Sequence, residues 1–166
     1  VDLGNLGDRG FRIDGVDAGD SSGWSVSGAG DVNGDGLADL IIGAPDAGFL
    51  PNSGESYIVF GKADVGLVDL ENLGTGGFQI IGTQGEQTGR SVSGAGDVNG
   101  DGLDDLIVGA PSANPGGAFP VDDAGSSYVI FGKADSASVI LNFLGSRGFR
   151  IDGIDADDEA GTSVSG

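Results

Sequence analysis

Oxygen-bearing side chains recur at alternate positions in two short segments of the chain. The first segment reads Asp31-x-Asn33-x-Asp35-Gly36-Leu37-x-Asp39, and the second reads Asp97-x-Asn99-x-Asp101-Gly102-Leu103-x-Asp105. Calcium prefers six to eight hard oxygen ligands with flexible geometry. Carboxylate and amide oxygens at positions 1, 3, 5 and 9, and the backbone carbonyl at position 7, supply such ligands, while the glycine at position 6 lets the backbone reverse. The spacing therefore predicts two calcium sites, whose ligands are Asp31, Asn33, Asp35, Leu37 and Asp39 in the first loop and Asp97, Asn99, Asp101, Leu103 and Asp105 in the second.

Other interpretations of these loops are weaker. Asp, Asn and Gly favour turns that hold no metal, but three carboxylates so close together repel one another unless a cation lies between them. Magnesium demands stricter octahedral geometry than calcium. An EF-hand needs Glu at position 12 and flanking helices, whereas Ile42 and Val108 stand there within apolar runs. A dockerin-like loop, which would open a helix, is disfavoured by the same test.

The composition excludes several classes of function. Among 166 residues there are 35 Gly, 26 Asp plus Glu and only 7 Lys plus Arg, giving a formal net charge of −19. So acidic a chain disfavours nucleic acid and anionic membranes as partners and suits divalent cations. Without Cys or His the chain can form neither a disulfide nor a Ser-His-Asp triad. No apolar stretch is long enough to predict membrane insertion, and no signal peptide is visible, as expected of a processed secreted chain or an excised fragment.

The acidic loops belong to a longer internal repeat. Residues 28–45 read GAGDVNGDGLADLIIGAP and residues 94–111 read GAGDVNGDGLDDLIVGAP, with 16 of 18 positions identical. The segment Gly10-Phe11-Arg12-Ile13 recurs in related form at 77–80 and 148–151, and Ser-Val-Ser-Gly occurs at 25–28, 91–94 and 163–166. Self-similarity at such a period is the signature of a repeat architecture.

Each repeat contains four short apolar runs that predict β-strands. They lie at about 24–30, 40–43, 56–60 and 78–81 in the first unit and at 90–96, 106–109, 127–131 and 149–152 in the second. The runs are rich in β-branched and aromatic residues and are bounded by Gly, Pro or Asp. One helical turn is expected within 65–73. Four strands per unit indicate an all-β fold built of β-propeller blades of four antiparallel strands. The small residues of the first strand suit the crowded axis. A β-sandwich or a solenoid is the alternative.

The segments Gly23 to Pro45 and Gly89 to Pro111 resemble the FG-GAP repeat of integrin α-subunit propellers and their bacterial relatives. The resemblance implies a calcium loop between the first two strands of each blade, on the lower face of a seven-bladed propeller, with the same ten residues as ligands. The chain departs from the pattern in having Ser22-Gly23 and Thr88-Gly89 where the family has Phe-Gly. Trp24 is replaced by Arg90 and Thr162 in the other copies, so an aromatic side chain is not required there.

The repeat boundaries divide the chain into four parts. Residues 1–22 are expected to end a preceding blade as its last strand, 23–82 and 83–153 to form two full FG-GAP blades, and 154–166 to begin a third with its first strand. Because a propeller closes with four to eight blades, the chain is expected to be part of a longer protein or to complete a ring as a homo-oligomer. In the second case, the trailing strand of one copy and the leading strand of another would share a blade.

The expected function is a calcium-binding repeat module for protein interaction, adhesion or scaffolding, in which calcium is structural and no catalysis occurs. Calcium loops of low affinity suit an extracellular or cell-surface location. A protein or glycan ligand is expected to contact the divergent loops 46–55 and 112–127, where Phe49 and Phe119 are candidate contacts unless they tuck back against the blade. Alternatives are a propeller portion of an extracellular calcium-dependent hydrolase or lyase, and a self-assembling repeat. The acidic segments Asp14 to Gly23 and Asp152 to Gly161 are expected to be solvated turns, or else a further cation site.

Overall fold

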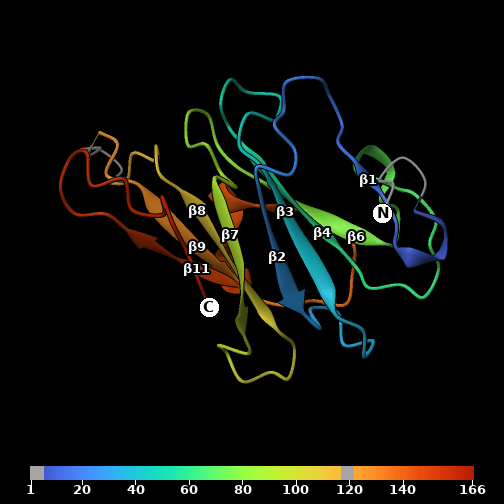
Figure 1. Ribbon diagram of the computed structural model, residues 1–166. Coiled ribbons are helices and arrows are strands. Elements are labelled where there is room, and N and C mark those ends of the chain that lie inside the picture. The colour runs from blue at the N-terminus through green and yellow to red at the C-terminus, as the bar shows by residue number, and fades with distance from the viewer. Residues whose placement is uncertain (1–5, 117–121) are drawn as a thin grey trace.

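Two sheets, each with four antiparallel strands, lie side by side in the computed structural model, which describes residues 6–116 and 122–166 (Figure 1). One sheet has the order β10-β6-β4-β3-β2 and the other β11-β9-β8-β7. The first blade consists of β2 (Ser25–Gly30), β3 (Asp39–Ala44), β4 (Glu55–Val59) and β6 (Gly77–Ile81), and the second of β7 (Ser91–Gly96), β8 (Asp105–Ala110), β9 (Ser126–Ile130) and β11 (Gly148–Asp152). This arrangement confirms the prediction of two blades with four antiparallel strands each.

The two blades share one hydrogen-bonding register. Ser25 pairs with Gly43 in the first blade, and Ser91 pairs with Gly109 in the second. In both blades the register shifts at the same place, between residues 28 and 30 or between 94 and 96, immediately before the acidic loop. The shift adds a residue to the first strand, which bends that strand and directs the loop away from the ladder.

Short parallel strands connect each blade to the one before it. Strand β10 (Val139–Ile140) follows the third strand of the second blade but pairs with β6 of the first. In the same way, β5 (Val68–Asp69) pairs with β1 (Ile13–Asp14), which belongs to the leading segment. The sequence repeat includes these residues but did not predict this pairing. The 3-10 helix η2 (Leu70–Asn72) confirms the expected turn, and others are η1 (Gly7–Arg9), η3 (Leu141–Phe143) and η4 (Gly145–Arg147).

The main hydrophobic core lies between the blades. Alternate residues of a strand point to opposite faces of its sheet, so each blade presents one apolar face to its neighbour. The first blade contributes Ile41, Ile58, Phe78 and Ile80, and the second contributes Val92, Leu106, Val108, Tyr128 and Ile130. The opposite face of the first blade, around Ile42, Tyr57 and Val59, is partly covered by Phe11, Ile13 and Val16 of the leading segment.

The first strands of the two blades, β2 and β7, run close together at the middle of the molecule (Figure 1). A Cβ atom at Gly94 would lie 2.9 Å from the carbonyl oxygen of Gly28, so only small residues permit this approach. The trailing segment repeats the relation, because a Cβ at Gly166 would lie 2.1 Å from the carbonyl oxygen of Gly94. Residues 162–166 nevertheless form no strand. Their assignment to a third blade stays a prediction.

In the ranges 6–116 and 122–166, no helix is long and apolar enough to cross a membrane.

Candidate metal centre

The two acidic loops occupy equivalent places, joining β2 to β3 and β7 to β8. The carboxylate of Asp31 lies at the centre of the first loop. Its Oδ1 accepts hydrogen bonds from the backbone N–H groups of Gly34 (2.8 Å) and Asp35 (3.0 Å), and its Oδ2 accepts one from Gly36 (2.9 Å). Asp97 accepts the same three bonds in the second loop, at 2.7, 3.0 and 3.0 Å. The loop backbone therefore winds around the first predicted ligand.

The side chains at positions 3 and 5 hydrogen-bond to each other and to the loop backbone. Asn33 Oδ1 accepts from the N–H of Asp35 at 2.8 Å, and Asp35 Oδ1 accepts from the N–H of Leu37 at 2.8 Å. The Asn33 amide also donates to Asp35 Oδ2 at 2.9 Å. Asn99, Asp101 and Leu103 repeat all three bonds, at 2.7, 2.9 and 2.8 Å. The structure thus brings together the predicted ligands at positions 1, 3 and 5 of each loop.

The aspartate at position 9 has an additional role that the sequence did not reveal. Asp39 is fully buried; its Oδ2 accepts from the N–H of Val32 (2.8 Å) and its Oδ1 from that of Gly61 (2.7 Å). Asp105 is equally buried and accepts from Val98 (2.9 Å) and Gly132 (2.8 Å). Each carboxylate therefore connects the start of its loop to the turn after the third strand. The repeated Phe-Gly-Lys-Ala-Asp at 60–64 and 131–135 was the available signal.

Burial raises the pKa of the Asp39 carboxyl above its ordinary value. The N–H groups of Gly61 and Val32 oppose this rise, and the negative charges of Asp35 and Asp31 add to it. The loop thus places two further negative charges, on Asp31 and Asp35, near the Asp39 carboxylate, which has little access to water. A cation bound nearby would favour the ionised form.

The donor set suits a hard cation, although the carboxylates are turned toward backbone donors. Within the described part of the chain, no three Asp or Glu side chains are grouped as ligands of one metal ion. Asp31 Oδ2 and Asp97 Oδ2 each accept a single N–H in their loop and so keep a second lone pair available. The side chains brought together at positions 1, 3 and 5 offer two carboxylates and one amide per loop, with no nitrogen or sulfur ligand from His or Cys. These residues therefore fit calcium by their chemistry.

The other predicted contact residues lie apart from the loops. The side chain of Phe49, between β3 and β4, is fully exposed, so the interpretation that it tucks back against the blade is wrong. Phe119 lies outside the described residues. In the acidic segments 14–23 and 152–161, Asp20 Oδ2 accepts from the N–H of Asp17 at 3.0 Å, and Asp158 Oδ2 accepts from that of Asp155 at 2.9 Å. Such bonds are typical of acidic turns.

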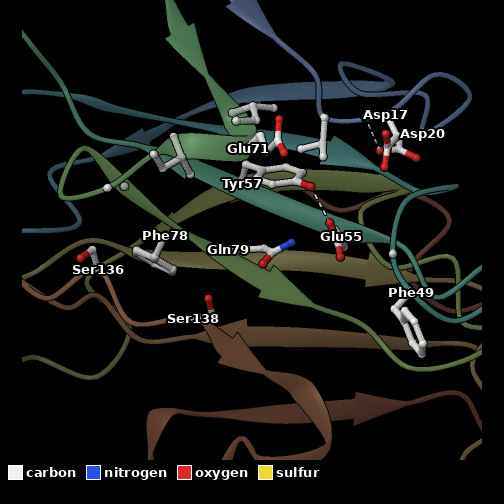
Figure 2. A pocket seen from close by; sticks show the side chains of 16 residues that line it. Asp17, Asp20, Phe49, Glu55, Tyr57, Glu71, Phe78, Gln79, Ser136 and Ser138 are labelled. Atoms are coloured by element: carbon white, nitrogen blue, oxygen red, sulfur yellow. Dashed lines mark hydrogen bonds between the residues drawn. The ribbon is translucent and has the colours of Figure 1, made fainter.

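A pocket of about 450 Å³ lies between the leading segment and strands β4 and β6 (Figure 2). The Tyr57 hydroxyl donates to Glu55 Oε2 at 2.5 Å, and burial raises the pKa of this phenol. Four carboxylates and no Lys or Arg are among its lining residues, which disfavours an anionic ligand. The lining consists of Val16, Asp17, Asp20, Gly48, Phe49, Glu55, Tyr57, Leu70, Glu71, Leu73, Gly74, Gly77, Phe78, Gln79, Ser136 and Ser138.

Two consecutive four-stranded blades, each with an acidic loop between its first two strands, define a β-propeller repeat module. The family model described as FG-GAP repeat matches residues 22–59 and 88–130, which are the first three strands of each blade. The chain is an FG-GAP repeat protein of the integrin-α-like type.

Similar proteins include integrins and a phospholipase. Integrin alpha-PS5 of Drosophila melanogaster is 40% identical over 111 residues, which are 63% of this chain and 10% of the integrin. Integrin alpha pat-2 of Caenorhabditis elegans is 39% identical over 88 residues, or 53% of this chain and 7% of that protein. Phosphatidylinositol-glycan-specific phospholipase D of Bos taurus is 37% identical over 120 residues, or 67% of this chain and 13% of the enzyme. The chain therefore spans a small part of the length of these relatives.

Proposed function

We propose that this chain is a calcium-binding β-propeller repeat module in which calcium has a structural role. The observation that carries the proposal is that both loops gather the side chains at positions 1, 3 and 5 around one turn, through the same hydrogen bonds. Two independent copies of one oxygen-lined turn are what two calcium sites require.

In this proposal Asp31, Asn33, Asp35 and Asp39 hold calcium with the Leu37 carbonyl, and Asp97, Asn99, Asp101 and Asp105 do so with the Leu103 carbonyl. The ion would supply positive charge among carboxylates that otherwise repel one another. Asp39 and Asp105 also hold each loop to the turn after its third strand. Calcium that orders a loop would therefore also stabilise the blade to which that loop is joined.

The module's proposed role is to bind a protein or a glycan, in adhesion or scaffolding, outside the cell or at its surface. The integrin relatives support this proposal. Calcium loops with affinities of about 10⁻⁴ to 10⁻³ M suit extracellular modules. The exposed Phe49 side chain is an apolar contact that the loop 46–55 offers to such a partner. Because the phospholipase D match covers 13% of that enzyme, we propose no catalytic role.

A calcium titration followed by thermal unfolding tests the proposal. Binding to the folded state alone stabilises a protein by about 2.7 kcal/mol per site when the ligand is at 100 times Kd. We expect the melting temperature to rise with calcium, and the rise to disappear in the Asp31→Ala/Asp97→Ala double variant. The matched control, Asp17→Ala/Asp122→Ala, removes two exposed carboxylates elsewhere and should keep the response. A wild-type melting temperature that does not change with calcium would contradict the proposal.

The end faces of the blade pair favour a second function, self-assembly. Phe149 and Ile151 of β11 are 42% and 51% exposed, although their counterparts in the first blade, Phe78 and Ile80, are buried between the blades. At the opposite end, Val26 is exposed although its counterpart Val92 is buried. The exposed face of β11 and the exposed face of the first blade therefore carry the same apolar residues as the two faces that pack together between the blades. A second copy can dock head to tail on this basis.

Light scattering in calcium tests the self-assembly proposal. We expect a discrete oligomer that dissociates in a Phe149→Glu/Ile151→Glu variant, because two charges would enter the apolar contact. A control variant, Asp155→Lys, alters an exposed residue beyond β11 and should assemble as the wild type does. A wild-type chain that stays monomeric at all concentrations would contradict the self-assembly proposal.

A further inference from the structure

The two acidic loops differ in sequence at position 8, which is Ala38 in the first and Asp104 in the second. We propose that Asp104 is a positioning residue for the first loop, through which the second blade raises the calcium affinity of the first loop. This inference rests on the proposed function, because it concerns the affinity of the same two loops. It goes further in stating that the two sites are coupled through Asp104.

Asp104 binds both polar backbone groups of Asp31. The N–H of Asp31 donates to Asp104 Oδ2 at 2.7 Å, and the N–H of Asp104 donates to the carbonyl oxygen of Asp31 at 3.1 Å. Asp31 holds the first ligand position, and its carboxylate is the centre of the first loop. Fixing its backbone from both sides limits where this carboxylate can lie. An alanine at position 8 has no side-chain acceptor for the first of these bonds.

Other groups of the second blade extend the contact. The N–H of Lys133 donates to the carbonyl oxygen of Val32 at 2.9 Å. The side chain of Leu103 lies against Gly34, with its Cδ2 3.0 Å from where a Cβ would stand. As a result Val32 is fully buried, whereas Val98, at the same position of the second loop, is 50% exposed. The second blade thus covers the first loop.

The glycine before the first loop supplies the space that Asp104 occupies. Gly30 has φ +77°, and a Cβ there would lie 2.1 Å from Asp104 Oδ2. Gly96, its counterpart before the second loop, has a similar φ of +65° but would have no atom within 4 Å of its Cβ. Both glycines carry the same backbone strain on substitution, and one of them also contacts Asp104. They form a matched pair for separating the Asp104 contact from strain.

The coupling follows from the place of Asp104 in its own loop. It directly precedes Asp105, the position-9 residue of the second loop. Calcium in the second loop would hold residues 97–105 in place, and with them the Asp104 carboxylate. By linkage, calcium in the first loop must favour binding in the second by the same factor.

Amide NMR of the ¹⁵N-labelled full chain, titrated with calcium chloride, tests the inference. The signals of Gly36 and Gly102 report on the first and second loops separately. In Asp104→Ala we expect the affinity of the first loop to fall about tenfold, as for loss of one charge-assisted hydrogen bond. Direct binding by the second loop should change less, by no more than the linkage factor. Asp104→Asn keeps an oxygen acceptor and should recover part of the affinity.

The glycine pair keeps the test decisive if Asp104→Ala fails to fold. Gly30→Ala should weaken the first loop by more than Gly96→Ala weakens the second, because both variants introduce the same strain and only Gly30→Ala also displaces Asp104. Equal weakening of both loops by Asp104→Ala, or equal weakening of each loop by its own glycine variant, would overturn the inference. Wild-type signals that do not move with calcium in either loop would instead overturn the proposed function, and the inference with it.

Discussion

The two acidic loops have nearly the same sequence but different surroundings. The first loop is covered by the second blade through Leu103, Asp104 and Lys133. No blade follows the second loop in the described structure, and its Val98 is half exposed. The contrast is reversed in the sheets, where Leu106 of the second blade is buried and its counterpart Leu40 of the first blade is exposed. Residues of one blade are therefore buried by the blade that follows or precedes it. For this reason the local sequence alone does not determine the environment of a loop.

The largest expected effect tests what the loops share. Asp39→Ala and Asp105→Ala each leave at least two N–H groups without a partner where the carboxylate was fully buried. At about 1–3 kcal/mol for each unsatisfied group, the free energy of unfolding should fall by about 2–6 kcal/mol in both variants. Urea unfolding in EDTA measures this without calcium. The exposed Asp35→Ala is the control, and a loss as small as that of the control would contradict the anchoring role.

A smaller effect tests what the loops do not share. Val32→Ala should lower the free energy of unfolding by about 1.6 kcal/mol from lost burial, with a further cost for the cavity. Val98→Ala should change it by about 0.5 kcal/mol or less, because exposed substitutions have little effect. Urea unfolding of the pair gives a direct measure of the cover provided by the second blade. Equal losses would show that this cover contributes nothing.

The contact between the starts of the first strands should contribute less again. The guanidinium of Arg90 lies 4.3 Å from the centre of the Trp24 ring, across the two blades. A half-exposed cation–π contact contributes about 0.5–1 kcal/mol. Arg90→Ala should lose that amount and Arg90→Lys should retain part of it, as measured by thermal unfolding. In a Trp24→Ala background, Arg90→Ala should have no further effect; an undiminished loss there would exclude the contact as its cause.

The smallest effect at neutral pH concerns a pair of buried phenols, one per blade. Burial raises the pKa of Tyr57 and of Tyr128 well above the ordinary tyrosine value of about 10. Above about pH 10 the unfolded chain loses these protons while the folded chain keeps them, so the free energy of unfolding falls as pH rises. Urea unfolding from about pH 8 to about pH 11 measures this decline. Tyr57→Phe should make it shallower, and an unchanged slope would remove Tyr57 as a source.

Much of the fold could be predicted because the repeat carries it. Two copies of Gly-Ala-Gly-Asp and of the apolar runs around Ile41 and Ile107 fixed the strands and their order within a blade. The three ligand positions gathered by each turn also followed from spacing. The sequence did not predict the parallel pairing of β10 with β6, because a two-residue strand has too little pattern to be recognised.

The anchoring role of Asp39 and the contact made by Asp104 also escaped prediction. Both depend on partners distant in sequence, Gly61 for the former and Asp31 for the latter. The sequence showed that position 8 is Ala38 in the first loop and Asp104 in the second. Nothing in it placed position 8 of the second loop beside position 1 of the first. Such contacts arise from the packing of blades, which the pattern within a blade does not describe.

The short parallel strands make the folding unit longer than the sequence repeat. Strand β10 lies within the second repeat yet forms the outer edge of the first blade's sheet, and β5 has the same relation to β1. A cut between repeats, for example after Gly82, would therefore remove an edge strand from the blade it was meant to isolate. A recombinant single blade needs residues through Leu144 of the next repeat. Insertions or duplications made in whole sequence repeats would preserve every edge except the last.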